Sequence, residues 1–187
     1  MPDLSEILVD ASAKMAKAIE VAKEDFGAIR TGRAHPGMFS KIMVDYYGTL
    51  TPLAQLASFQ VPEARMALVS PYDKSAMGLI ERAIRESDLG VNPATDGAVI
   101  RVNFPQLTEE RRKDYIKVAR GKAEDSKISI RNIRRAAMDL MAKMEKDGDV
   151  GKDDIARSEK DLEKITTEHV NEIDKLLKHK ETELLEV

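Results

Sequence analysis

Three arginines within five residues are the strongest chemical signal in the sequence. Arg131, Arg134 and Arg135 lie in the stretch ISIRNIRRAAMDLM. A guanidinium group presents a fixed fork of N–H donors that suits phosphate or carboxylate oxygens. The whole chain carries a formal net charge of −3, so its overall charge does not account for the cluster. The cluster indicates either an ordinary solvated helix face or a local site for an anion.

Basic side chains are concentrated in one segment. Residues 105–135 carry ten basic and five acidic groups, whereas residues 136–187 carry nine and fifteen. On a helical projection of ~100° per residue, the cations of the first segment gather beside its apolar face. We define the basic stripe as Lys113, Lys117, Arg120, Lys127, Arg131, Arg134 and Arg135. Such a stripe would be about 33 Å long, interrupted strongly only by Glu124. This segregation favours an anionic partner.

Aromatic side chains that could stack on bases are nearly absent from the segment, where Tyr115 stands alone. The stripe therefore favours recognition of a nucleic-acid backbone or shape over the reading of single-stranded bases. Arg30 and Arg33 flank Gly32 elsewhere in the chain. They are either surface cations near a linker or an extension of the same basic surface.

Three long amphipathic patterns would position these side chains. Apolar residues recur at spacings of three and four over residues 4–29, 108–146 and 155–185, which predicts three helices. Thr108 suits the N-cap of the second helix, and Gly148 suits the position after its end. None of the three is apolar all round, so each needs partners. We expect a three-helix bundle in which the second and third helices are antiparallel, because the turn between them is short.

Residues 31–105 have a different character, with most of the prolines and glycines. Short alternating runs predict strands in KIMVDYYG, QLASFQVP, RMALVSP and AVIRVNFP, and DKSAMGLIERAIRESDLG predicts one helix. The predicted fold class is α+β with two domains. Residues 1–30 and 106–187 would form the bundle, and residues 31–105 would form an inserted β/α/β domain joined by two hinge linkers. The hinge residues would be Thr31, Gly32, Phe104 and Pro105.

Most enzymatic and membrane functions find no support in the residues. The chain has no Cys, and its three histidines share no metal-ligand spacing. After its second glycine, GAIRTGRA has Arg33 and Ala34, where a phosphate loop has Lys followed by Ser or Thr. No apolar run approaches the ~20 residues of a membrane span, and the N-terminus lacks the pattern of a signal peptide. We expect a cytoplasmic monomer that is not an enzyme and has no metal, cofactor or membrane partner. A helical adaptor whose arginines bind an acidic protein is the competing class.

Four stretches of the sequence combine unusual motifs in a fixed order, and an acidic helix follows them. They are IRTGRAHP, YYGTLTPLAQLASFQV, SDLGVNP and IRVNFPQLTEERRKDYIKVARGKAEDSKISIRNIRRAAMD. Together they resemble the ribosome recycling factor family over nearly the whole chain. The resemblance implies an L-shaped molecule with a three-helix bundle and a β/α/β domain. It also implies an activity without covalent chemistry. The protein would bind the large ribosomal subunit across the A and P sites and, with elongation factor G and GTP, split the post-termination ribosome to release mRNA and tRNA.

The resemblance also implies which residues contact large-subunit ribosomal RNA. By motif they are Arg30, Arg33, Arg112, Arg131 and Arg134. The stripe adds Lys117, Arg120 and Arg135 to this predicted set. The sequence RRAAMD departs from the family, which often has an acidic residue directly after the arginines; the departure makes the local surface more positive.

Overall fold

The chain divides into two compact units. The computed structural model describes residues 2–186. The first unit runs up to Lys23 and includes Ala119–His179, and the second contains Glu24–Val118 with the segment from Lys180 onward. The predicted fold class, α+β with a helical bundle and a small sheet domain, is confirmed. The compact units divide within the long helices, and the domain boundaries after residues 30 and 105 stay a prediction.

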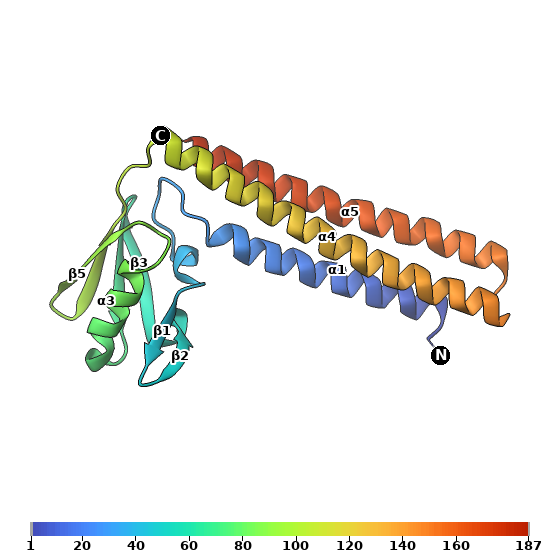
Figure 1. Cartoon of the computed structure of the whole chain (residues 1–187), viewed down its shortest axis with the longest axis horizontal. Coiled ribbons are helices and arrows are strands. Elements are labelled where there is room, and N and C mark those ends of the chain that lie inside the picture. Colours follow the sequence, from blue (N-terminus) through green and yellow to red (C-terminus); the bar gives the residue numbers. More distant parts are fainter. Residues whose placement is uncertain (1, 187) are drawn as a thin grey trace. The chain divides into compact units, whose positions relative to one another are not determined.

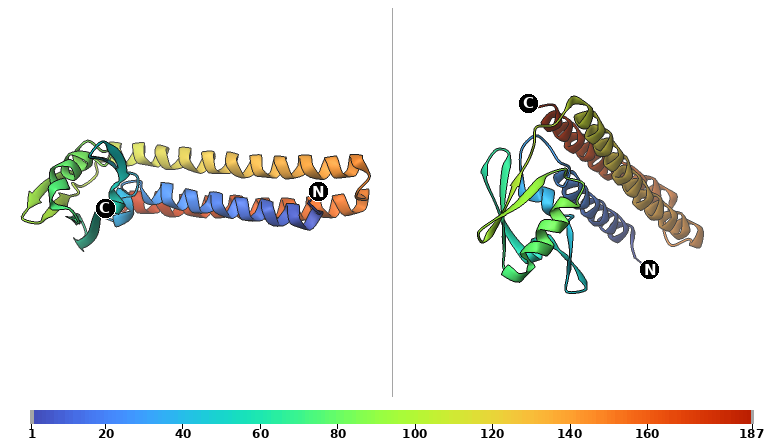
Figure 2. Two further views of the ribbon diagram at one scale, coloured as in Figure 1. Left: turned by 90° about the horizontal axis from the view of Figure 1, so that it is seen from below. Right: turned by 60° about the vertical axis from the view of Figure 1, so that its left-hand side comes forward.

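Three long helices correspond to the three amphipathic patterns. They are α1 (Leu4–Gly27), α4 (Glu109–Asp147) and α5 (Lys152–Leu185), and within the first unit they lie side by side (Figures 1 and 2). The turn between α4 and α5 reverses the chain, so these two helices are antiparallel, as predicted. No helix among residues 2–186 is long and apolar enough to cross a membrane.

Local hydrogen bonds explain where the helices begin and end. Asp3 and Glu6 cap α1 reciprocally, because each side chain accepts from the other's backbone N–H at 2.8–2.9 Å. The Thr108 hydroxyl accepts from the Arg111 N–H at 3.2 Å, which confirms the predicted N-cap of α4. After α4, Gly148 adopts φ +77°, a left-handed conformation that glycine takes without steric strain.

The bundle of the first unit is held by small and medium apolar side chains. Its fully or almost fully buried residues include Ile7, Ala11, Met15, Ile19, Ala22, Ala119, Ala123, Ile130, Ala137, Met141, Ile155, Leu162 and Ile173. Burying each Ile, Leu or Met of this kind contributes about 1.5–3 kcal/mol. Because these residues recur along one side of each helix, the charged residues of α4 are left on the outside.

The second unit contains two antiparallel sheets and the short helices. A hairpin joins β1 (Met43–Tyr46) to β2 (Thr49–Pro52). The larger sheet has the order β3-β4-β6-β5. Its strands are Ala57–Glu63, Met66–Pro71, Val99–Asn103 and Asn92–Asp96, in that order. The helical elements are η1 (Pro36–Phe39), α2 (Leu53–Leu56), η2 (Lys74–Ala76) and α3 (Met77–Arg85).

Aromatic contacts organise the core of this sheet domain. Phe39 stacks on Phe59 with ring centroids 5.1 Å apart and meets Phe104 edge to face at 6.1 Å. Ile80 and Ile84 of α3 are completely buried in the same cluster. The core therefore joins the sheet, α3 and the segment around Phe39.

Candidate nucleic-acid interface

The three arginines of the stretch ISIRNIRRAAMDLM project from α4, and the opposite side of this helix packs in the core of the bundle. Ile130 is completely buried and Ala137 is 4% exposed, so they fix the rotation of α4 about its axis. Arg131, Arg134 and Arg135 are all exposed. The structure thus places these three side chains on the surface of the first unit, as the sequence predicts.

Carboxylate partners lie beside three neighbouring cations of the basic stripe, Lys127, Arg131 and Arg134. Arg131 Nη1 lies 3.0 Å from Glu124 Oε1 on the same helix. Two further pairs join α4 to α5. Their distances are 2.7 Å for Arg134 Nη2 to Glu163 Oε2 and 2.5 Å for Lys127 Nζ to Asp174 Oδ1. The stripe is therefore less free of opposite charge than its sequence suggests, because α5 supplies acids to its edge.

These pairs differ in their access to solvent. The Arg131 and Arg134 side chains are 56% and 44% exposed, whereas the Lys127 side chain is 19% exposed. Exposed ion pairs contribute only about 0.2–1 kcal/mol, so a competing anion can replace the carboxylate. The two arginines are consequently available to a polyanion, while Lys127 mainly joins α4 to α5.

The other stripe residues are exposed along α4. Arg120 and Arg135 belong to the first unit, and Lys113 and Lys117 belong to the second. Among residues 2–186 no carboxylate forms an ion pair with Arg135 or Lys117. Lys113 Nζ lies 2.8 Å from Glu109 Oε1, and this contact raises the pKa of Lys113 and lowers that of Glu109.

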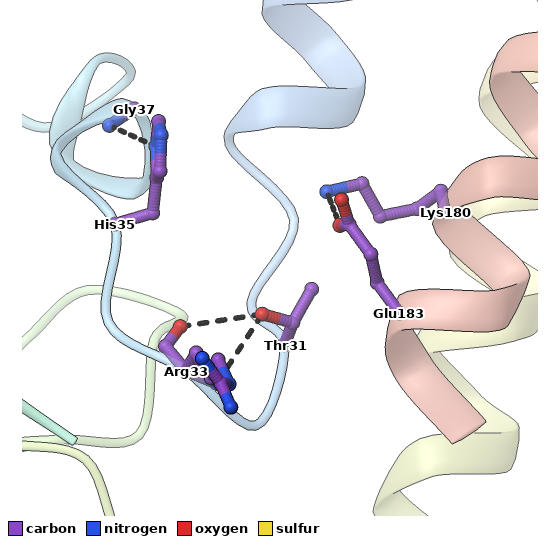
Figure 3. A network of polar contacts seen from close by, with 6 residues as sticks. All are labelled: Thr31, Arg33, His35, Gly37, Lys180 and Glu183. Atoms are coloured by element: carbon purple, nitrogen blue, oxygen red, sulfur yellow. Dashed lines mark hydrogen bonds and ion pairs between the residues drawn. The ribbon is translucent and has the colours of Figure 1, made fainter. Parts of the chain in front are cut away.

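Two further arginines that the family resemblance implies contact RNA, Arg33 and Arg112, reach solvent and lie in the second unit. Arg112 is half-buried in the first turn of α4, and Arg33 is exposed. Figure 3 shows how Thr31 shapes the backbone at Arg33: the Thr31 hydroxyl donates to the Arg33 carbonyl at 3.2 Å. The same view shows the Lys180–Glu183 ion pair of α5, at 2.7 Å.

Arg30 is not the surface cation that the sequence predicts. It is only 4% exposed, and Nη1 donates to the carbonyl oxygens of Leu89 and Gly90 at 3.0 and 3.1 Å. Nη2 donates to the carbonyl of Pro105, and the guanidinium lies 5.7 Å from the centroid of the Phe104 ring. Burial lowers the pKa of Arg30. Because its terminal donors are used inside the unit, Arg30 is a structural clamp in this structure, and its contact with ribosomal RNA stays a prediction.

The predicted hinge residues lie around this clamp. Thr31 and Phe104 are 6% and 2% exposed, and Phe104 belongs to the core of the sheet domain. A Cβ added to Gly32 would meet only the Glu186 carbonyl oxygen, at an ordinary 3.7 Å. Motion about these residues remains a prediction.

Arg111 was missed by the sequence interpretation. Its guanidinium lies 5.6 Å from the Tyr115 ring centroid, and the Tyr115 hydroxyl donates to the Asp88 carbonyl at 3.3 Å. The i, i+4 spacing of Arg111 and Tyr115 is a signal that could have identified the contact. No group of three or more potential metal-ligating side chains occurs among residues 2–186.

An edge of exposed arginines on a helical bundle is a surface suited to a polyanion, because each guanidinium can donate to anionic oxygens. The sequence model of ribosome recycling factor matches residues 22–185. A ribosome-recycling factor of Streptomyces avermitilis is 64% identical over 184 residues, covering 98% of this chain and 100% of the relative. One from Kineococcus radiotolerans is 62% identical with the same coverage. This chain belongs to the ribosome recycling factor family, whose members are translation factors.

Solved structures agree with this assignment. A solution structure of a ribosome recycling factor covers 100% of both chains with a TM-score of 0.75 and 35% identity. A second similar structure, of the T. thermophilus factor, was described with the E. coli elongation factor G bound to the E. coli post-termination complex. It has a TM-score of 0.69 and 39% identity, and covers 99% of this chain and 100% of that one.

Proposed function

We propose that this chain recycles ribosomes after translation terminates. It would bind the large ribosomal subunit across the A and P sites and act with GTP-bound elongation factor G to split the subunits, freeing mRNA and tRNA. Family membership over almost the whole chain supports this function. The structurally similar T. thermophilus factor, described together with elongation factor G on a post-termination complex, supports the choice of partners.

The observation that carries the proposal is the exposed arginine cluster on α4. Each guanidinium can donate to phosphate oxygens, and these contacts need no particular base. The binding residues in this proposal are Arg33, Arg112, Lys117, Arg120, Arg131, Arg134 and Arg135. Neutralising several phosphates releases counterions, so affinity should fall steeply with salt.

Arg30 has a different part in this proposal. Its hydrogen bonds to Leu89, Gly90 and Pro105 fix one arrangement of the linkers within the second unit. Bending at Thr31, Gly32, Phe104 and Pro105 would let the sheet domain move while the bundle stays on ribosomal RNA. The work of splitting would come from elongation factor G and GTP, so the chain itself would need no covalent chemistry and no cofactor. We place this activity in the cytoplasm, with the factor acting as a monomer.

Co-sedimentation with purified large subunits tests the binding step. Arg134→Ala should weaken binding about three- to tenfold at low salt and reduce the salt dependence by about one ion, because one phosphate contact is lost. Arg157→Ala is the matched control: it removes a 79% exposed arginine of α5, outside the stripe, and should change affinity less than twofold. Equal binding by the two variants would refute the stripe as the RNA site. Binding without salt dependence would instead favour a helical adaptor for a protein partner.

A further inference from the structure

Two of the arginines that we propose bind RNA form ion pairs with carboxylates of the same chain. Glu124 lies seven residues, or about two helical turns, before Arg131 on the same side of α4. Glu163 reaches Arg134 from α5, with 2.7 Å between Nη2 and Oε2. The Glu124 and Glu163 side chains are 56% and 57% exposed, so both pairs form in contact with water.

A carboxylate and a phosphate compete for the same donors. Both present anionic oxygens, and both accept charge-assisted hydrogen bonds from guanidinium nitrogens. The N–H groups that contact Glu124 and Glu163 therefore become available to RNA only when they change partner. Even if they stay close, each carboxylate repels the incoming phosphate.

We propose that Glu124 and Glu163 are intramolecular competitors that weaken RNA binding by Arg131 and Arg134. This inference rests on the proposed function and adds two acidic residues that set the affinity of the same site. RNA binding then includes an exchange, in which a phosphate replaces the carboxylate at each guanidinium. Arg135 undergoes no such exchange, because no carboxylate among residues 2–186 pairs with it.

The exchange has a size that can be measured. Removing one exposed competing carboxylate should raise affinity about two- to fivefold, the range expected from an exposed ion pair. The gain should shrink at high salt, where the pair is already screened in the wild-type protein. Glu163→Gln keeps the length and polarity of the side chain and removes only its charge.

The experiment measures dissociation constants for purified large subunits with wild-type protein, Glu163→Gln and Glu124→Gln. Asp10→Asn is the matched control, because it removes a carboxylate of α1 that pairs with Lys14 at 2.6 Å and has similar exposure, 58%. We expect both glutamine variants to bind two- to fivefold more tightly than Asp10→Asn. Circular dichroism at increasing temperature confirms that each variant is folded.

Double variants separate local exchange from general charge effects. Glu163→Gln should lose its advantage in an Arg134→Ala background, where no guanidinium remains to be released, and keep it in an Arg135→Ala background. Equal affinities for Glu163→Gln and Asp10→Asn would overturn the inference. So would an advantage that persists without Arg134. The proposed RNA site fails separately, if Arg134→Ala itself binds as well as the wild-type protein, and the proposed function fails if the wild-type protein does not bind large subunits at all.

Discussion

Replacing Arg30 by Met should destabilise the second unit by about 2–3 kcal/mol. Methionine keeps much of the side-chain length but donates no hydrogen bond. The Leu89 carbonyl lies in a buried contact and would lose its donor, whereas the contacts to the Gly90 and Pro105 carbonyls are only part-buried, so water can replace the donor there more readily. Charge-assisted bonds contribute about 1.5–3 kcal/mol each, so the buried one dominates the loss. Part of this loss of stability is offset, because the substitution also removes the buried charge of Arg30, whose Nε has no hydrogen-bond partner among the described residues.

Amide hydrogen exchange is the suitable assay, because the chain has no Trp to report unfolding of the sheet domain. Exchange through unfolding of the second unit, read in peptides from β4 and β6, should accelerate about 30- to 150-fold in Arg30→Met. Arg33→Met is the matched control: it alters an exposed side chain three residues away and should change exchange little. Arg30→Lys should be no more stable than Arg30→Met, since it leaves a buried charge with fewer well-placed donors. Equal exchange in Arg30→Met and Arg33→Met would refute the clamp.

Two further predictions concern stability. In urea unfolding, Gly121→Ala should stabilise α4 by about 0.5–1 kcal/mol because glycine is flexible in the unfolded chain, whereas Gly148→Ala should destabilise by about 1 kcal/mol. A Cβ at Gly121 meets nothing within 4 Å, while Gly148 has φ +77°, so equal effects would contradict this reasoning. Hydrogen bonds from Ser75 and Tyr46 hold the pKa of Asp73 below its ordinary 3.8. The free energy of unfolding of the wild-type protein should therefore exceed that of Asp73→Asn by its full amount above about pH 4, and this excess should fade as pH falls through the lowered pKa. Urea unfolding at pH 6 and pH 3 measures the excess. An excess that is the same at both pH values would count against this reasoning.

The long helices could be predicted from sequence because their apolar spacing matches the helical period. The strands were predicted less completely. The runs that became β1, β3, β4 and β6 alternate or are continuously apolar, but β2 and β5 were not recognised. Thr49–Pro52 is short, and Asn92–Asp96 has a proline and little apolar character, so each becomes a strand through pairing with a neighbour.

The exposed arginines of α4 could also be predicted, since one helix's own periodicity determines which side faces the core. The burial of Arg30 could not, because its acceptors lie 59, 60 and 75 residues away along the chain. A signal did exist for the acids of α5. Folding α4 back on α5 about the turn near residues 149–150 places Lys127 opposite about residue 172 and Arg134 opposite about residue 165. Asp174 and Glu163 lie within two residues of those positions.

Splitting of post-termination ribosomes, followed by light scattering with elongation factor G and GTP, tests the central claim most directly. The triple variant Arg131→Ala, Arg134→Ala, Arg135→Ala removes the exposed cluster from α4. A control with Arg157→Ala, Lys160→Ala and Lys164→Ala removes the same charge from exposed positions of α5. We predict that splitting by the stripe variant slows roughly tenfold or more at subsaturating factor, while the control stays close to wild type. A folded stripe variant that splits ribosomes as fast as the control would contradict the account.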